Sequence, residues 1–95
     1  MTLGLDYEVR PGQEAAFEDL FRTVAAAMAS VPGHVRTGLY RQVDGPGRYL
    51  VHSEWRDRAS FTAFIRSEAF ARVTSRGLSE LLAAPPRHRV YALSP

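Results

Sequence analysis

The chain has 95 residues, 45% of them hydrophobic, and a formal net charge of +2. It contains no cysteine, which excludes disulfides, thiolate nucleophiles and cysteine-based zinc sites. Its twelve basic residues are all arginines, scattered among acidic residues, so no basic stripe predicts a nucleic-acid partner. No apolar run approaches the roughly 18 residues that a membrane span needs, and the opening segment lacks the pattern of a signal peptide. We therefore expect one small cytoplasmic domain over residues 1–95.

The first half of the chain predicts a strand, a helix and a hairpin. Apolar and polar residues alternate over 3–9, which is typical of a strand with one buried face. Helical spacing then predicts an amphipathic helix from Gln13 to Ser30, which ends before Pro32 and Gly33. Alternation returns over 34–43 and 48–55, and the Asp-Gly-Pro-Gly turn between them indicates a hairpin.

The second half predicts helices and a last strand. Asp57 is a suitable N-cap for a helix that runs to about Arg66, because its carboxylate can accept first-turn N–H groups. The apolar phase then slips, so Ser67 predicts a break and a second cap, giving two helices or one kinked helix. A final strand is expected over 87–93. The order β-α-β-β-α-β predicts an α+β, ferredoxin-like fold with a four-stranded antiparallel sheet and helices on one face.

Three stretches together resemble the antibiotic biosynthesis monooxygenase family. They are Pro-Gly-Gln-Glu-Ala-Ala-Phe from position 11, Val-Pro-Gly-His from 31, and Tyr-Leu-Val-His-Ser-Glu-Trp from 49, which Asp57, Phe61 and Ser67-Glu-Ala-Phe follow. The resemblance implies the dimeric α+β barrel, in which two ferredoxin-like subunits pack sheet against sheet. A homodimer also agrees with the mixed polar and apolar character of the second sheet face.

The resemblance implies several possible activities. For two of them, this sequence lacks residues that work beside the Trp in the relatives. In heme-degrading relatives a Trp at the position of Trp55 works with an Asn and a His, which are Leu5 and Thr74 here, so heme degradation is less favoured. In anthrone oxygenases the Trp works with an Asn and in some cases a Tyr, which are Val51 and Phe61 here. The aromatic residue is therefore retained and its polar partners are replaced.

Strand and helix periodicity predict a substrate pocket between the sheet and the helices. Trp55 shares its strand face with Val51, and Phe61 and Phe64 face the sheet from the following helix. Tyr7 and Phe17 are possible further walls. Such a pocket suits a flat aromatic substrate, although aromatic residues at this spacing also form ordinary cores.

Polar candidates for chemistry are few. His52 is the candidate general base, but its parity places it on the dimer side unless a bulge turns it. Arg72 and Arg76 could stabilise a phenolate from the helical segment, or could simply be solvated, and Tyr40 could donate a hydrogen bond from the dimer side. His34 and His88 are expected at strand ends on the surface. No spacing predicts a metal site.

Two functions are therefore weighed. One is a cofactor-independent monooxygenase that acts on an aromatic polyketide, an anthrone or phenol-like molecule, with O2 and without metal or flavin. In it Trp55, His52 and Arg72 would be catalytic, and the substrate would be bound by Tyr7, Tyr40, Val51, Phe61, Phe64 and Arg76. The alternative is a non-redox polyketide cyclase or small-molecule binding protein on the same barrel.

Overall fold

The computed structural model describes residues 1–74, 78–85 and 87–91. Its strands are β1 (Thr2–Glu8), β2 (His34–Arg41), β3 (Arg48–Trp55) and β4 (Arg87–Tyr91). Its helices are α1 (Glu14–Met28), α2 (Arg58–Ile65), α3 (Glu68–Thr74) and α4 (Leu78–Leu81). The strands lie side by side in the order β2-β3-β1-β4, and every neighbouring pair is antiparallel. The predicted ferredoxin-like α+β fold is confirmed.

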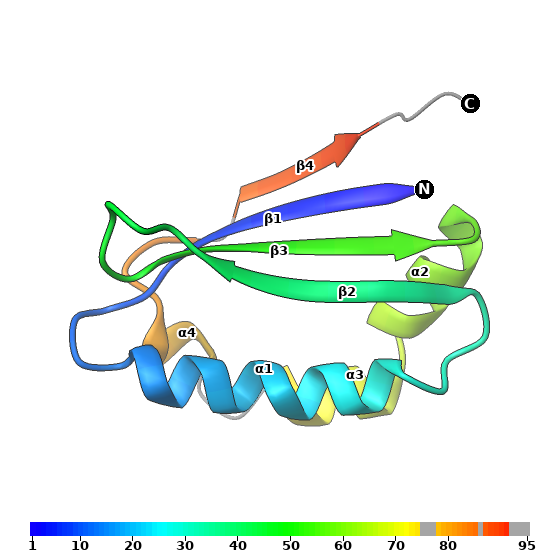
Figure 1. Cartoon of the computed structure of the whole chain (residues 1–95). Helices are drawn as coiled ribbons and strands as arrows, with labels where there is room; N and C mark the ends of the chain where they lie inside the picture. Colours follow the sequence, from blue (N-terminus) through cyan, green and yellow to red (C-terminus); the bar gives the residue numbers. More distant parts are fainter. Residues whose placement is uncertain (75–77, 86, 92–95) are drawn as a thin grey trace.

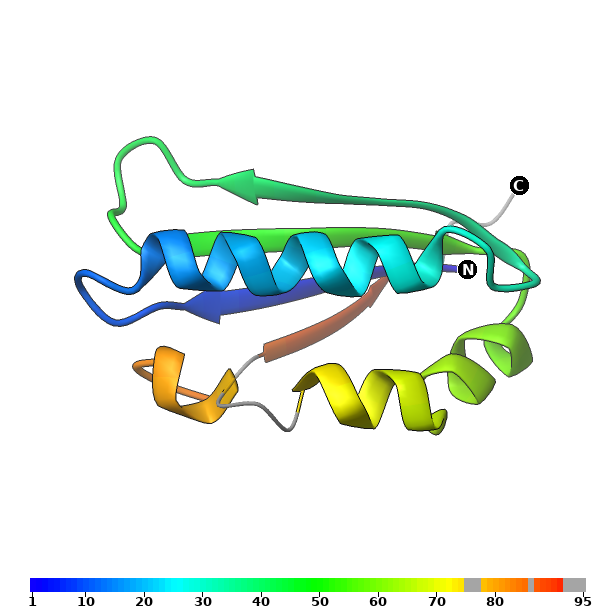
Figure 2. The ribbon, with the colours of Figure 1, turned by 90° about the horizontal axis from the view of Figure 1, so that it is seen from below.

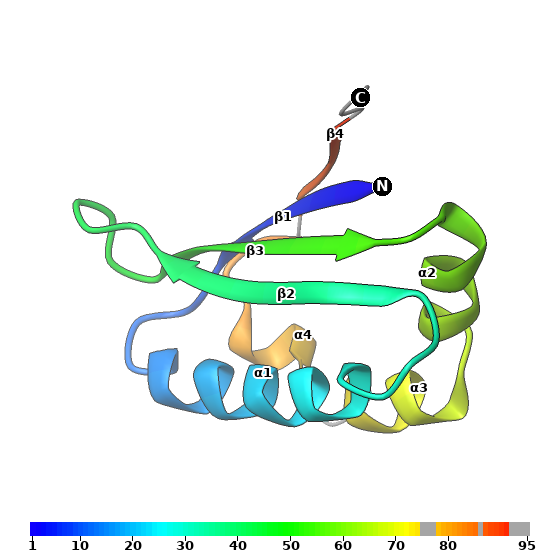
Figure 3. The same ribbon diagram turned by 45° about the vertical axis from the view of Figure 1, so that its right-hand side comes forward.

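The helices cover one face of the sheet. Figures 1 and 2 show α1 running along the sheet with α3 and α4 beside it, while α2 lies at the end where β3 finishes. Figure 3 shows the opposite face with no described helix over it. The molecule is therefore a two-layer sandwich whose second sheet face is left open.

The caps that the sequence predicts are present. The Asp57 carboxylate accepts the backbone N–H of Ser60 at 2.8 Å, which fixes the start of α2 and lowers the pKa of Asp57. Ser67 accepts the backbone N–H of Phe70 at 3.2 Å and so caps α3. The predicted break at Ser67 separates α2 from α3, and a further short helix, α4, was not predicted, so the described chain holds three helices between β3 and β4 where two or one kinked helix were expected.

The buried core is split into two groups along the sheet. One group, around Trp55 and Phe64, lies under the ends of β3 and α1, where Leu3 and Met28 join it. The other lies near the β2–β3 turn and consists of Val9, Phe17, Tyr49 and Leu82. Between the two groups lie Leu5 and Val51, whose side chains line an internal space.

Candidate functional site

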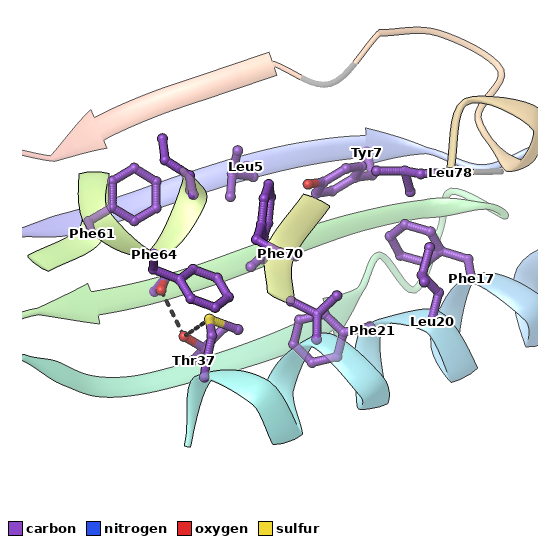
Figure 4. Close-up of a pocket in the computed structure, with 15 residues that line it drawn as sticks. Leu5, Tyr7, Phe17, Leu20, Phe21, Thr37, Phe61, Phe64, Phe70 and Leu78 are labelled. Carbon is purple, nitrogen blue, oxygen red and sulfur yellow. Dashed lines mark hydrogen bonds between the residues drawn. The ribbon is translucent and has the colours of Figure 1, made fainter. Parts of the chain in front are cut away.

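A cavity of about 420 Å³ lies between the sheet and the helices. Volumes of this size are typical of small-molecule sites. Its floor comes from β1, β2 and β3, its sides from α1 and from α2 to α4, as Figure 4 shows. The lining side chains are mostly aromatic or aliphatic: Leu5, Tyr7, Phe17, Leu20, Phe21, Val24, Met28, Thr37, Val51, Ser53, Phe61, Phe64, Ile65, Phe70 and Leu78.

The aromatic residues around the cavity come from helices and strands and pack on one another. Phe64 contacts Phe70 with ring centroids 5.2 Å apart and an interplanar angle of 67°. At the other end Phe17 contacts both Tyr7 at 5.2 Å and Tyr49 at 5.0 Å. Edge and tilted contacts of this kind hold rings in fixed positions, so the cavity presents a preformed apolar surface.

The polar groups of the cavity lie at its two ends. Thr37 lies beside Phe64 and within 2.7 Å of the Ser53 hydroxyl, and Tyr7 lies beside Phe17 and Leu78, with its hydroxyl directed toward Phe70 (Figure 4). Tyr7 pairs with Tyr49 across the sheet, and Tyr49 lies four residues before Ser53 on β3. At about 3.3 Å per residue, the Cα atoms of Tyr49 and Ser53 are roughly 13 Å apart. The cavity is therefore mostly apolar, with Thr37 and Ser53 at one end and the Tyr7 hydroxyl reaching in from the other.

The Tyr7 hydroxyl is available to a ligand. No hydrogen bond joins it to any other group in the described residues. Burial raises the pKa of Tyr7, so the hydroxyl keeps its proton at neutral pH. It can therefore donate a hydrogen bond to an oxygen placed at this end of the cavity.

Trp55 lies behind the cavity wall, which corrects the expectation that its ring forms the wall. It is only 2% exposed, and its ring contacts Phe61 and Phe64, each at 5.6 Å. Its indole N–H donates to Ser53 Oγ at 2.7 Å, so the indole already has a partner within the protein. Phe61, Phe64, Val51 and Tyr7, by contrast, do line the cavity as expected, and Phe17 joins them.

The other candidate residues lie away from this cavity. His52 and Tyr40 project from the open face, where they line a shallow depression with Leu50, as their parity predicted. Arg72 is exposed on α3 and lies 3.5 Å from Glu68, and Arg76 falls outside the described residues. Among the described residues, no group of three His, Asp or Glu side chains could hold a metal ion.

The structure reveals a polar group that the sequence did not predict. Thr37 Oγ1 lies 2.7 Å from Ser53 Oγ and 2.8 Å from Nε2 of His34. His34 was expected on the surface, but a register irregularity between His34 and Arg36 turns its ring against Trp55, with centroids 4.9 Å apart. Partial burial lowers the pKa of His34. In the sequence, the only indication of this polar group is that Thr37 and Ser53 lie on the two strands of the predicted hairpin.

The family model described as antibiotic biosynthesis monooxygenase matches residues 2–75. The chain belongs to the antibiotic biosynthesis monooxygenase family. Among solved structures, the cofactor-independent oxygenase SnoaB from Streptomyces nogalater is similar with a TM-score of 0.82 and 25% identity, over 98% of this chain and 93% of that one. A conserved protein from Methanosarcina mazei has a TM-score of 0.88 at 23% identity, over 95% and 88%, and supports the fold alone.

Longer proteins that are similar in sequence to this chain fall into two groups by name. A candidate heme-binding protein from Natronomonas pharaonis is 36% identical over 87 residues, which are 92% of this chain and 14% of that protein. The 42.8 kDa protein of the whiE locus in Streptomyces coelicolor is 33% identical over 61 residues, 64% of this chain and 15% of that protein. The chain thus spans about one-seventh of each. No helix in the described residues has the length and apolarity of a membrane span.

Proposed function

We propose that this chain is a cofactor-independent monooxygenase that binds a hydroxylated aromatic molecule of several fused rings, such as an anthrone-type polyketide. The observation that carries the proposal is the cavity of about 420 Å³, with aromatic walls and hydroxyl groups at both ends. The name of SnoaB, a cofactor-independent oxygenase, supports the same reaction class.

The chemistry requires little from the protein beyond binding and deprotonation. A deprotonated anthrone can itself give an electron to O2. One oxygen atom then enters the ring carbon as a carbonyl, and the other leaves as water with the two hydrogens of that carbon. Val51, Phe61 and Phe64 would hold the rings and exclude water, and the Tyr7 hydroxyl would hydrogen-bond a ring oxygen. Trp55 would fix Phe61, Phe64 and Ser53 from behind.

The archaeal relatives raise heme as a ligand, and the cavity does not fit it well. Among the described residues, no His lines it, and no Arg lines it to pair with the heme carboxylates. Two lining residues could ligate iron in principle. The Met28 sulfur lies 3.7 Å from the Thr37 hydroxyl that donates to it, and burial raises the pKa of Tyr7 against the phenolate form. We therefore derive no step through heme.

Oxygen uptake by the metal-free protein with anthrone as the probe tests the proposal. We expect uptake above the uncatalysed rate and a product with one oxygen atom gained and two hydrogen atoms lost. Unchanged mass, or loss of water, would instead support the cyclase or binding-protein alternative. A sharp Soret band at one heme per chain, with no oxygen uptake, would overturn the proposal in favour of heme binding.

We also propose that the open sheet face binds a second copy of this chain. Tyr40 on this face is 58% exposed, and it borders a depression of about 430 Å³ with Leu50 and His52. The resemblance to barrel-forming relatives supports a sheet-to-sheet homodimer. In such a dimer His52 and Tyr40 would contact the partner subunit and not the substrate.

A further inference from the structure

Four side chains form a continuous hydrogen-bonded series from the cavity wall to His34. The indole N–H of Trp55 donates to Ser53 Oγ at 2.7 Å, and Ser53 Oγ lies 2.7 Å from Thr37 Oγ1. Thr37 Oγ1 lies 2.8 Å from Nε2 of His34. Ser53 and Thr37 line the cavity, whereas His34 lies outside it and is half-buried. The series therefore connects the cavity to a titratable group that reaches solvent.

The donors and acceptors of this series can be assigned in one direction. A hydroxyl has one O–H to donate and two lone pairs that accept. If the Ser53 O–H donates to Thr37 and the Thr37 O–H turns from the Met28 sulfur, 3.7 Å away, to unprotonated Nε2 of His34, 2.8 Å away, these three hydrogen bonds are satisfied. Ser53 then accepts from Trp55 with one lone pair. Its second lone pair remains for a donor in the cavity.

We propose that His34 accepts the proton of a hydroxyl group bound in the cavity, through Ser53 and Thr37. The ligand O–H bond breaks and its electron pair stays on the ligand oxygen. Ser53 takes this proton and passes its own to Thr37, which passes its own to Nε2 of His34. The products are a ligand anion, two neutral hydroxyls and an imidazolium, which then loses a proton to water. This inference rests on the proposed function, since it supplies the deprotonation which that function needs.

The surroundings of His34 suit a proton acceptor. Burial lowers its pKa from 6.5, so the ring is neutral at pH 7 and Nε2 can accept. The charged groups around it are the Met1 amino group, bonded to the Trp55 carbonyl at 2.7 Å, and the Arg56–Asp57 pair before α2. The Arg36–Glu54 pair lies on the open face of the sheet. Trp55 is a positioning residue in this scheme, because its N–H directs the Ser53 hydroxyl toward Thr37.

Alizarin, a three-ring dihydroxy aromatic whose colour changes on ionisation, is a probe that needs no oxygen chemistry. We expect bound alizarin to ionise at least tenfold faster after a pH jump in the parent than in His34→Gln. Thr37→Val, of nearly equal volume, should interrupt the series and slow colour formation after a pH jump at least tenfold. Thr37→Ser should restore it. Thr23→Val, at an exposed threonine of α1, is the matched control.

The outcomes separate this inference from the proposed function. A dye that ionises at the same rate in the parent and in His34→Gln overturns the inference, as does a dye that does not bind at all. Oxygen uptake from anthrone that is equal in the parent, His34→Gln and Thr37→Val overturns the inference and leaves the oxygenase proposal standing. His34-dependent ionisation of alizarin without any oxygen uptake supports the inference and overturns the oxygenase. Thermal unfolding of each variant checks that the fold is kept.

Discussion

Trp55 and Ser53, two residues apart on β3, are joined by a side-chain hydrogen bond of 2.7 Å in which the indole N–H donates. The bond makes the single tryptophan part of the protein interior and not a group exposed to the ligand. Trp55→Phe keeps an aromatic ring but removes this donor and leaves a gap beside Phe61 and Phe64. We expect a loss of roughly 1–3 kcal/mol in the free energy of unfolding.

The same variant should lower oxygen uptake, because the Ser53 hydroxyl loses the partner that directs it. Urea denaturation measures the first effect, and anthrone-dependent oxygen consumption at saturating substrate measures the second. Leu82→Ala, a cavity variant in the other core group, is the control for stability loss alone. Equal oxygen uptake in the Trp55→Phe variant and its parent would contradict the positioning role of Trp55.

Tyr7→Phe isolates the other end of the cavity. Its hydroxyl has no hydrogen-bond partner in the described residues, so removing it should leave the free energy of unfolding within about 0.5 kcal/mol of the parent. A ligand oxygen at this end would lose a hydrogen bond. We expect alizarin to bind about 5- to 10-fold more weakly, as measured by fluorescence quenching or calorimetry. Loss of stability with unchanged affinity would show that the hydroxyl serves the fold.

The sequence predicted most of the fold because its signals are local. Asp57 and Ser67 cap α2 and α3 through their own backbone neighbours, and strand parity correctly placed Val51 toward the helices and His52 away from them. Local signals could not predict the irregularity after His34, which depends on how β2 pairs with β3. That irregularity brings His34 to Trp55.

The position of Trp55 itself shows a second limit. Parity gives the face of a strand but not the depth of a side chain beneath its neighbours. Phe61 and Phe64 were expected beside Trp55, and they do contact it, yet they lie between its ring and the cavity. The division of the core into two groups with a space between them depends on contacts between segments far apart in the chain, which no single segment encodes.

Tyr49→Phe tests a partly buried hydrogen bond with a defined pH dependence. Tyr49 donates to the Glu18 carboxylate at 2.6 Å, and burial followed by this bond raises the pKa of Tyr49 from 10.0 to about 12. We expect the variant to lose about 1 kcal/mol in the free energy of unfolding at pH 8. Since the folded-state pKa is raised, this contribution is complete below pH 10 and is lost as the pH rises through about 12.

Urea titrations at pH 8 and pH 11.5 measure this change. The stability difference between parent and Tyr49→Phe should shrink at the higher pH, while Tyr7, whose pKa is also raised by burial, contributes alkaline loss equally in both proteins. A difference that stays constant between the two pH values would contradict the assignment.

Gly33, which precedes His34, and Gly12 have the same backbone conformation but different surroundings, so their alanine variants can be compared. Both have φ of +86°, where an L side chain is strained. An alanine Cβ at position 12 meets nothing within 4 Å, whereas at position 33 it collides with the Ser60 side chain. We expect Gly12→Ala to cost roughly 1 kcal/mol and Gly33→Ala about 1–3 kcal/mol more, because Ser60 must move from the Asp57 cap. Chemical denaturation of the two variants compares them, and equal losses would contradict the collision.

Tyr40→Arg tests the second copy on the open sheet face. Tyr40 lies opposite Leu50 in the β2–β3 ladder and borders the depression with His52, so an added charge would be buried against the partner sheet. We expect the parent to sediment as a dimer at micromolar concentration and the variant to shift toward monomer by at least tenfold in Kd. Val43→Arg is the control, since Val43 is fully exposed in the hairpin turn. A monomeric parent would overturn the homodimer, and a dimer unaffected by Tyr40→Arg would place its interface elsewhere.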